Sequence, residues 1–269
     1  LGDVYKRQIS VLAGALDDEA NRDKYAAFAE GYKVYFDPST RFMRGLDSEG
    51  NWRTPFNPRA SNHRNDDYCE GTAWQWTWFV PHDVDGLVEL MGGRDAFIGK
   101  LDSLFTADSK LEGESTSVDI SGLIGQYAHG NEPSHHIAHL YNYVGQPWRT
   151  QEIVDEVLHT LYFNNPDGLS GNEDCGQMSA WYILNAMGFY QVCPGKPVYS
   201  IGRPLFNEAT VHLKDGKSFK VIAHNNSRDN KYVRSIVLNG NKLETPFFTH
   251  QDIVDGGTLE LTMGSEPLK

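Results

Sequence analysis

The sequence predicts a mainly α-helical chain with a smaller β-rich part at its C-terminal end. Two observations carry this prediction. Apolar residues recur at spacings of three and four through much of residues 1–195, which is the period of a helix. After Cys193-Pro-Gly195 the spacing changes to two, which is the period of a strand. We therefore expect a helical part over residues 1–195 and a β-rich subdomain over residues 196–269.

About six segments of the helical part have the expected period. Their ranges are 16–35, 83–91, 94–105, 133–144, 150–162 and 176–188. The first begins with an acidic turn and continues with an apolar stripe of Tyr25, Phe28 and Tyr32. Gly92-Gly93 should end the second helix and Gly188 the last, because glycine readily adopts the backbone conformation that follows a helix.

Strands are expected where apolar residues alternate between turn residues. The segment 41–53 should form a hairpin around the turn Asp47–Gly50. In the C-terminal part the expected strands are 209–213, 219–223, 235–238 and 258–262, with turns at Asp215-Gly216 and Asn239-Gly240.

Composition argues against several classes of function. The 269 residues are 39% hydrophobic, so they can bury a substantial core. A formal net charge of −12 argues against nucleic acid as a partner, because phosphates attract an excess of Lys and Arg. No apolar run reaches the roughly 18–20 residues of a membrane span. Three cysteines make neither a disulfide framework nor a spaced zinc pattern.

The segment Gly168–Trp181 contains a carboxylate-rich turn before a predicted helix. Glu173 and Asp174 lie between two glycines, and Gln177 follows at helical spacing. Negative charge is favoured at the start of a helix, where backbone N–H groups are free. Two interpretations stay open: the turn caps the helix, or it directs a carboxylate into a cleft.

A second acidic motif, Asp66–Asp83, is rich in tryptophan. Glu70 is followed by Gly71 and then by Trp74, Trp76 and Trp78. A carboxyl group surrounded by indole rings loses its water and stays protonated near neutral pH, as a general acid must. The alternative is an aromatic core segment with Glu70 at its solvent edge.

A third cluster, Tyr127–His136, combines imidazole and oxygen-bearing side chains. His135 and His136 are adjacent, so on a helix they diverge and rarely bind one ion together. The zinc motif H-E-x-x-H is absent. Asn131 and Glu132 offer hard oxygens that suit Ca²⁺. Each histidine is equally well explained as a hydrogen-bonded structural residue.

Two separated carboxylates are the minimum equipment for hydrolysis of a glycosidic bond. One donates a proton to the leaving oxygen while the other activates water. Glu70 and Asp174 are the candidates for this pair. Their spacing does not identify the sugar or the stereochemical outcome.

The three motifs together, in this order, resemble glycoside hydrolase family 92. The segments that carry the resemblance are Glu70-Gly-x-x-Trp74 with Val80-Pro-His-Asp83, Gly130–His136, and Gly171–Tyr182 with Gly188-Phe-Tyr. The family consists of calcium-dependent exo-acting α-mannosidases, many of which cleave α-1,2 linkages of N-glycans and yeast mannan. It is known mainly from bacteria. The resemblance implies an (α/α)6 toroid preceded by a β-sandwich domain, and inversion at the anomeric carbon.

The resemblance also implies roles for individual residues. Glu70 would be the general acid and Asp174 the general base, while Asn131 and Glu132 would lie near the calcium ion. Some relatives have an acidic residue where this chain has Asn172. The positions that would line the sugar site are Trp74, His82, Asp83, His135, His136 and Gln177.

The chain is predicted to be the C-terminal part of such an enzyme. About six helices make a partial toroid, whereas a complete one needs twelve, and no β-sandwich precedes them. The chain begins without a methionine or a signal peptide, and residues 1–8 are a candidate non-native addition. We expect the parent protein to act on mannose-containing oligosaccharides in the periplasm or outside the cell, and the fragment alone to be weak or inactive.

Two other functions stay open. One is a non-catalytic carbohydrate-binding protein on the same fold, which would not depend on Glu70 or Asp174. The other is a toroidal enzyme that acts on another sugar, or a phosphorylase. A phosphorylase needs a cationic phosphate site, and none of the three motifs contains Arg or Lys.

Overall fold

The computed structural model describes residues 2–269 as two compact units. The first unit ends at Ser134, and the second runs from His135 to Lys269. The larger sheets begin further along the chain, after the helix α9 (Gln177–Met187), so the second unit contains both helices and the β-rich part. The predicted order of a helical part followed by a β-rich part is confirmed. Closure of the helices into a toroid stays a prediction.

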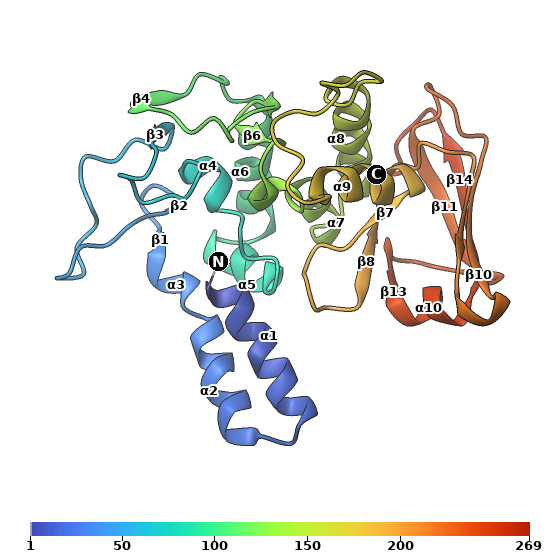
Figure 1. Cartoon of the computed structure of the whole chain (residues 1–269), viewed down its shortest axis with the longest axis horizontal. Helices are drawn as coiled ribbons and strands as arrows, with labels where there is room; N and C mark the ends of the chain where they lie inside the picture. Colours follow the sequence, from blue (N-terminus) through green and yellow to red (C-terminus); the bar gives the residue numbers. More distant parts are fainter. Residues whose placement is uncertain (1) are drawn as a thin grey trace. The chain divides into compact units, whose positions relative to one another are not determined.

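The first unit begins with a pair of helices that lie side by side, α1 (Gly2–Ala15) and α2 (Glu19–Ala29) (Figure 1). Asp18 caps α2 by accepting a hydrogen bond from the Asn21 N–H. The predicted helix 16–35 is interrupted near Gly31 and resumes as α3 (Tyr32–Tyr35). The predicted stripe is wrong in part, because Phe28 is 49% exposed.

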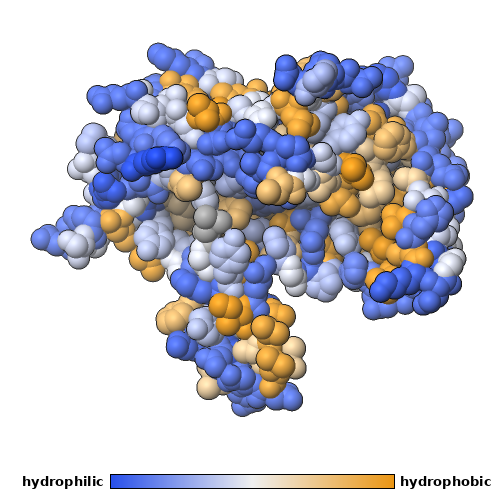
Figure 2. Space-filling model, viewed as in Figure 1, coloured by the Kyte–Doolittle hydropathy of each residue, from blue (hydrophilic) through white to orange (hydrophobic). Residues whose placement is uncertain are grey.

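The α1–α2 pair exposes several large apolar side chains, which gather on its surface (Figure 2). Of the candidate non-native addition at residues 1–8, residues 2–8 form the first turns of α1, and residue 1 lies outside the described residues. The apolar side chains exposed on the pair and on the loop between the two helices are Tyr5, Ile9, Val11, Leu12, Leu16 and Phe28.

Three further helices build the core of the first unit. They are α4 (Ala73–Trp76), α5 (Val84–Leu90) and α6 (Arg94–Thr106). The last two agree with the predicted ranges, and Gly92 separates them with a φ of 97°. Trp78 and Phe97 meet edge to face at 5.3 Å in the fully buried centre.

Short strand pairs and helical turns complete the first unit. The strands are β1 (Phe36–Asp37), β2 (Phe42–Met43), β3 (Ala60–Asn62), β4 (Glu112–Ser115), β5 (Leu123–Ile124) and β6 (Tyr127–Ala128). The pair β3–β4 is parallel, and the other two pairs are antiparallel. The predicted turn at Asp47–Gly50 is confirmed by a bridge between Leu46 and Trp52. The 3₁₀ turn η1 (Glu132–Ser134) ends the unit.

Lys100 on α6 is held against two aromatic rings of the same unit. Its Nζ lies 3.2 Å from the centre of the Phe42 ring and 4.6 Å from that of Trp74. Among residues 2–269 no carboxylate lies within ion-pair distance of this ammonium. Burial, with a smaller contribution from Arg41, lowers the pKa of Lys100 to about 7.

Lys100 is therefore expected to make the free energy of unfolding depend on pH. In the unfolded chain a lysine keeps its proton up to about pH 10.4, whereas folded Lys100 releases it near pH 7. The unfolded state then binds more protons between pH 7 and 10, so stability rises with pH in this window. We expect Lys100→Met to remove this rise and to add roughly 1–2 kcal/mol at pH 7, a value discounted because the side chain is partly exposed. Urea unfolding at several pH values measures it.

The control for this measurement is Lys110→Met, which changes an exposed lysine in the same unit. It should leave the pH dependence as it is in the unmodified chain. Parallel stability curves for Lys100→Met and the unmodified chain between pH 7 and 10 would contradict the assignment.

Four helical segments of the second unit precede its strands in the sequence. They are η2 (Ile137–His139), α7 (Leu140–Tyr143), α8 (Pro147–Thr160) and α9 (Gln177–Met187). The continuous helix predicted over 133–144 is wrong, because this segment forms separate short turns. The predictions for α8 and α9 are confirmed, including the end of α9 at Gly188, whose φ is 103°.

A five-stranded sheet in the order β12-β11-β14-β10-β9 dominates the β-rich part (Figure 1). Its strands are β9 (Glu208–His212), β10 (Ser218–His224), β11 (Tyr232–Leu238), β12 (Asn241–Lys242) and β14 (Gly257–Gly264). Strands β10 and β14 are parallel, and the other neighbours are antiparallel. The β9–β10 hairpin was predicted, while the turn at Asn239-Gly240 leads to β12 rather than directly to β14.

A smaller sheet in the order β13-β8-β7 packs into the same core. It consists of β7 (Phe189–Tyr190), β8 (Val198–Ile201) and β13 (Phe247–Thr249). The 3₁₀ turn η3 (Lys214–Gly216) and the helix α10 (His250–Asp255) complete the unit. Phe248 stacks on Phe219 of the larger sheet at 5.8 Å. No helix within residues 2–269 has the length and apolarity needed to cross a bilayer.

Candidate active site

The two candidate catalytic carboxylates share an uncommon backbone conformation. Glu70 has a φ of 50° and Asp174 a φ of 54°. Non-glycine residues rarely occupy this left-handed region, and those that do concentrate in turns and functional sites. Glu70 belongs to the first unit and Asp174 to the second, and each is described within its own unit.

The backbone around Glu70 is held from two sides. The indole Nε1–H of Trp76 donates to the carbonyl oxygen of Cys69 at 2.7 Å. The side-chain amide of Asn131 donates to the carbonyl oxygen of Glu70 at 2.9 Å and lies 3.5 Å from its carboxylate. A Cβ on Gly71 would lie 2.7 Å from the Trp76 Nε1, so only glycine allows this close approach.

A buried capping box fixes the helix α4 that carries Trp76. Thr72 accepts a hydrogen bond from the Trp74 N–H, and Gln75 accepts one from the Thr72 N–H at 2.7 Å. The Gln75 amide also donates to the carbonyl of Gln126 at 2.6 Å. Neighbouring backbone thus anchors the helix start that follows the Glu70 turn.

Of the two interpretations of the Glu70 segment, the structure fits the second, in which Glu70 lies at the solvent edge of an aromatic segment. The Glu70 side chain is exposed in this chain. Trp78 is fully buried against Phe97, and Trp74 packs against Phe42 at 4.9 Å. Trp76, one of the three indoles noted in the sequence but not among the expected sugar-site residues, is the one whose N–H bonds the loop before Glu70.

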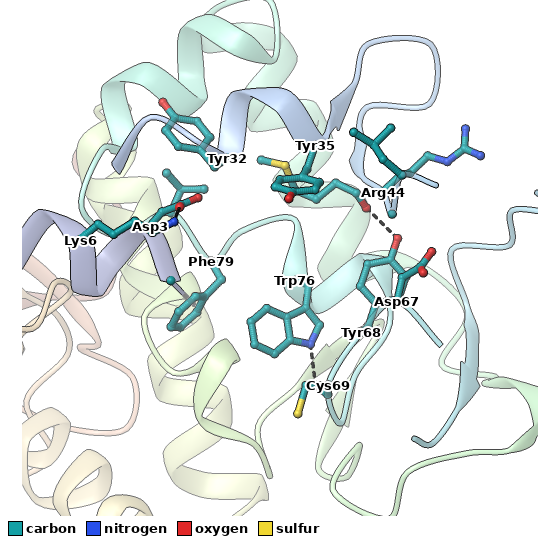
Figure 3. Close-up of a pocket in the computed structure, with 15 residues that line it drawn as sticks. Asp3, Lys6, Tyr32, Tyr35, Arg44, Asp67, Tyr68, Cys69, Trp76 and Phe79 are labelled. Carbon is teal, nitrogen blue, oxygen red and sulfur yellow. Dashed lines mark hydrogen bonds and ion pairs between the residues drawn. The ribbon is translucent and has the colours of Figure 1, made fainter. Parts of the chain in front are cut away.

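A cavity of about 530 Å³ adjoins the same loop (Figure 3). This volume lies within the range of small-molecule sites. Aromatic rings form much of the wall, and α1 contributes one charged pair at the rim. The aromatic residues that line it are Tyr32, Tyr35, Tyr68, Trp76 and Phe79.

His82 and Asp83, expected in the sugar site, both make hydrogen bonds within the first unit. Asp83 caps α5 by accepting from the Gly86 N–H at 2.9 Å, and it accepts from the Tyr32 hydroxyl at 2.7 Å. Burial raises the pKa of the Asp83 carboxyl, but these hydrogen bonds outweigh burial and lower it overall. The His82 Nε2 lies 3.0 Å from the Ala29 carbonyl, and burial lowers its pKa.

The turn at Asn131 and Glu132 places two oxygen-bearing side chains next to each other, as part of a calcium site would require. Asn131 is 5% exposed, and its Oδ1 accepts from the Glu132 N–H at 3.1 Å. Two oxygen-bearing side chains are far fewer than the six to eight oxygens that Ca²⁺ takes. Within residues 2–269 no group of three or more His, Cys, Asp or Glu residues could hold a metal ion. The side-chain oxygens of Asn131 and Glu132 are of the kind that calcium binds, but they supply only part of the oxygens that the ion needs.

In the second unit, Glu173 holds the turn that carries Asp174. Its carboxylate accepts from the backbone N–H of Gly176 and, at 3.0 Å, from that of Ser179. The hydrogen bonds to Ser179 and Gly176 lower the pKa of Glu173, as at a helix N-terminus. Asp174, Cys175 and Gly176 all have positive φ, and Asp174 is exposed. Glu173 therefore caps the helix, while its neighbour Asp174 has the exposed carboxylate.

Gln177 and His135 are brought together behind this turn. The Gln177 amide nitrogen lies 3.0 Å from the His135 Nδ1 and 3.3 Å from the Tyr190 hydroxyl. The Trp181 indole donates to the His135 carbonyl at 2.9 Å. His135 and His136 are 1% and 4% exposed, so the polar atoms of both histidines need partners inside the protein. Tyr190, the last residue of the Gly188-Phe-Tyr segment, belongs to the same cluster but was not among the expected site residues.

Comparison with known proteins extends over nearly the whole chain. Residues 4–265 match the family model of the glycosyl hydrolase family 92 catalytic domain. A family 92 α-mannosidase from Bacteroides thetaiotaomicron, solved with mannoimidazole, is 40% identical with a TM-score of 0.93, over 99% of this chain and 35% of that chain. A family 92 inverting mannosidase from Bacteroides thetaiotaomicron VPI-5482 is also 40% identical. Its TM-score is 0.86, over 98% of this chain and 36% of that chain.

A curated fungal relative is also similar. An uncharacterized secreted glycosidase from Arthroderma benhamiae is 32% identical over 200 residues, which is 73% of this chain and 24% of that protein. The chain thus spans about a third or less of the length of these relatives. The family match covers residues 4–265, which include all three sequence motifs. The fold is also similar to that of a solved member of the family. The chain therefore belongs to glycosyl hydrolase family 92.

Proposed function

We propose that this chain is part of an exo-acting α-mannosidase that hydrolyses its substrate with inversion. The observation that carries the proposal is the pair of held turns, each presenting a carboxylate at a left-handed residue, in a chain of this family. Related chains described as an α-mannosidase with bound mannoimidazole and as an inverting mannosidase support the choice of sugar and outcome.

Glu70 acts as general acid in this proposal. It protonates the glycosidic oxygen while the bond to the anomeric carbon breaks, so the leaving sugar departs as an alcohol. Asp174 acts as general base. It accepts a proton from the water that attacks the anomeric carbon from the opposite face, which inverts its configuration. Asn131 positions the acid through its hydrogen bond to the Glu70 carbonyl.

Gln177, His135 and His136 are proposed to support the sugar site from the second unit. The hydrogen bond between Gln177 and His135 fixes both side chains beneath the Asp174 turn. Trp74 was expected in the site as well, and its contacts with Phe42 and Lys100 suit support of α4. We infer for the parent protein an N-terminal β-sandwich domain, action on α-1,2-linked mannose of N-glycans or mannan, and a periplasmic or extracellular location.

The proposal is tested by assaying the isolated chain and a longer parent protein with aryl α-mannosides and α-1,2-mannobiose. We expect hydrolysis by the parent and little or none by the chain alone. Release of the β-anomer of mannose, followed by NMR, would establish inversion. Hydrolysis of aryl glucosides or galactosides in place of mannosides would favour the toroidal enzyme for another sugar. Sugar binding without any turnover would favour the non-catalytic protein.

Calcium is proposed as the metal, with Asn131 and Glu132 as two of its oxygen donors. Bound calcium would supply a positive charge that binds and orients sugar hydroxyls. We expect EDTA to abolish activity of the parent and Ca²⁺ to restore it, with Glu132→Gln raising the Ca²⁺ concentration needed for half-activation at least about tenfold. Calcium binding measured by calorimetry provides a readout separate from activity.

The matched control is Glu114→Gln, which changes an exposed glutamate of β4 in the same unit. It should leave the calcium requirement unaltered. Activity that resists EDTA, or an unchanged calcium response in Glu132→Gln, would overturn this assignment.

A further inference from the structure

His139 is a buried histidine of the second unit to which the proposed chemistry gives no role. It is the last residue of the turn η2, four positions after His135. Its Nδ1 lies 3.0 Å from the Ser200 hydroxyl oxygen, and its Nε2 lies 2.8 Å from the Asn185 Oδ1. His139 and Asn185 are 0% exposed, and Ser200 is 1% exposed. Both ring nitrogens therefore have partners inside the protein, so neither can bind a metal ion or touch a sugar.

The partners of the His139 ring determine which of its nitrogens carries the proton. The Asn185 amide nitrogen donates to the Trp181 carbonyl at 2.9 Å, so the Asn185 Oδ1 faces the ring and the Nε2 must donate to it. The Nδ1 is then an acceptor for the Ser200 hydroxyl. The Asn142 amide in turn donates to the Ser200 oxygen at 2.6 Å. These bonds agree with a single arrangement of hydrogens, in which the ring is neutral.

The surroundings of His139 keep its ring neutral and in one place. Burial lowers the pKa of His139 to about 4, while the hydrogen bond with Asn185 raises it by less and His136 lowers it further. A Cβ on Gly202 would lie 3.1 Å from the ring carbon Cε1, so glycine at this position lets the ring pack tightly against the backbone. The ring is therefore suited to act as a fixed connector between hydrogen-bonding groups.

Two sets of contacts lead from this ring to the polar cluster behind the turn of the proposed base. Asn185 is bonded to the Trp181 carbonyl, and the Trp181 indole donates to the His135 carbonyl at 2.9 Å. The ring also packs on Tyr190, with the ring centres 5.6 Å apart. The Tyr190 hydroxyl lies 3.3 Å from the amide nitrogen of Gln177. Both members of the Gln177–His135 pair are thus connected to the same buried ring.

We propose that His139 is a positioning residue, whose neutral ring holds the Gln177–His135 pair in place for sugar binding. The inference rests on the proposed function, in which this pair supports the sugar site. It uses contacts of the second unit alone. Because both nitrogens of His139 are already bonded, the residue acts on the pair through Trp181 and Tyr190 and not by contact with the sugar.

Nitrogen NMR of the histidine rings in the whole chain tests the state of the His139 ring. We expect its signals to show the proton on Nε2 at neutral pH. They should stay unchanged as the pH is lowered to about 6, because the pKa of His139 is about 4. His139→Gln, which lacks the ring, identifies these signals. A proton on Nδ1, or a ring that becomes charged in this range, would overturn the proposal.

Three variants of the whole chain test whether the ring positions the pair. His139→Leu removes both ring nitrogens, and Ser200→Ala removes only the hydrogen donor to Nδ1. In both we expect the NMR signals of the Trp181 indole N–H and of the His135 ring to shift. In His139→Gln the side-chain amide can donate to Asn185 and accept from Ser200, so these signals should return most of the way. If His139→Leu does not fold, the other two variants decide.

Kinetics of the parent protein on an aryl α-mannoside separates positioning from a merely structural role. Ser200→Ala is expected to raise KM about tenfold with kcat unaltered, because a weakened sugar site binds the ground state and the transition state less well by the same factor. A variant that only folds less completely would lower the apparent kcat and keep the native KM. His139→Gln should bring KM back towards the native value.

Leu259→Ala is the matched control, because it removes a fully buried side chain from the sheet core of the same unit. Thermal unfolding should show lower stability, while the Trp181 and His135 signals and the KM of the parent remain native. Equal shifts in this control, or native signals in both Ser200→Ala and His139→Leu, would contradict the positioning role.

The outcomes also separate this inference from the proposed function. If the parent hydrolyses mannosides and KM stays native in Ser200→Ala and His139→Leu, only the positioning role fails. If the parent hydrolyses no glycoside, the role of His139 in sugar binding fails together with the proposed function. Shifted signals in the chain together with a raised KM in the parent support both.

Discussion

Replacement of Glu70 by Gln is expected to lower kcat of the parent enzyme on α-1,2-mannobiose by about 10²–10⁴-fold. The amide has nearly the shape of the carboxyl group but cannot release a proton to the leaving oxygen. The loss should be much smaller on a dinitrophenyl α-mannoside, because this leaving group departs without protonation. Steady-state kinetics on the two substrates measures the difference, and sugar binding should survive.

The comparison between substrates makes this prediction specific to a general acid. Glu49→Gln changes an exposed glutamate in a surface turn of the same unit and should leave both rates unaltered. Equal losses of Glu70→Gln on both substrates would show that Glu70 has another role. Because the Asn131 amide donates to the backbone carbonyl of Glu70, this hydrogen bond should remain in the variant.

Asp174→Asn is expected to lower kcat by about 10²–10⁴-fold on both substrates alike. Activation of water is needed whatever the leaving group is, so an easily departing group gives no relief. The fold should stay intact, because Glu173, and not Asp174, supplies the carboxylate that caps α9. Kinetics on the two substrates and thermal unfolding of the variant check these two expectations.

Two further changes in the same loop control this experiment. Asp167→Asn removes another exposed carboxylate of the loop and should leave activity unaltered. Glu173→Ala should lower stability first and activity as a consequence, because the backbone N–H groups of Gly176 and Ser179 lose their acceptor. A strong loss of stability in Asp174→Asn would show that Asp174 holds the turn, against the proposed division of roles.

Much of the fold could be predicted because local periodicity and end signals agree. The helices α5, α6, α8 and α9 have apolar residues on one face, and glycines end α5 and α9. The helix expected over 133–144 could not be separated from short turns by periodicity. Its apolar side chains are buried although the segment is not a continuous helix, and Ile137, Leu140 and Tyr141 are all at or below 1% exposure.

The site was predicted by residue type more reliably than by environment. The sequence left open whether the turn before α9 caps the helix or presents a carboxylate; in the structure Glu173 caps α9 while Asp174 is exposed. Burial of Glu70 was one of two interpretations, and the structure fits the other, because Trp74 and Trp78 pack against phenylalanine rings. His82 and Asp83 look like sugar ligands in sequence. Their partners, Ala29 and Tyr32, are more than fifty positions away and cannot be read from local spacing.

The sequence by itself determined the family resemblance, the order of helices and strands, and the two carboxylates that carry the proposed chemistry. These depend on residue type and short spacings, which a linear chain contains in full. Tertiary structure decided the partners that hold them: Trp76 and Asn131 for Glu70, and the Gln177–His135 contact behind the Asp174 turn. Hydrogen bonds between Asn131 and Glu70 or between Gln177 and His135 join residues far apart in the chain. Only folding within each unit brings such donors and acceptors together.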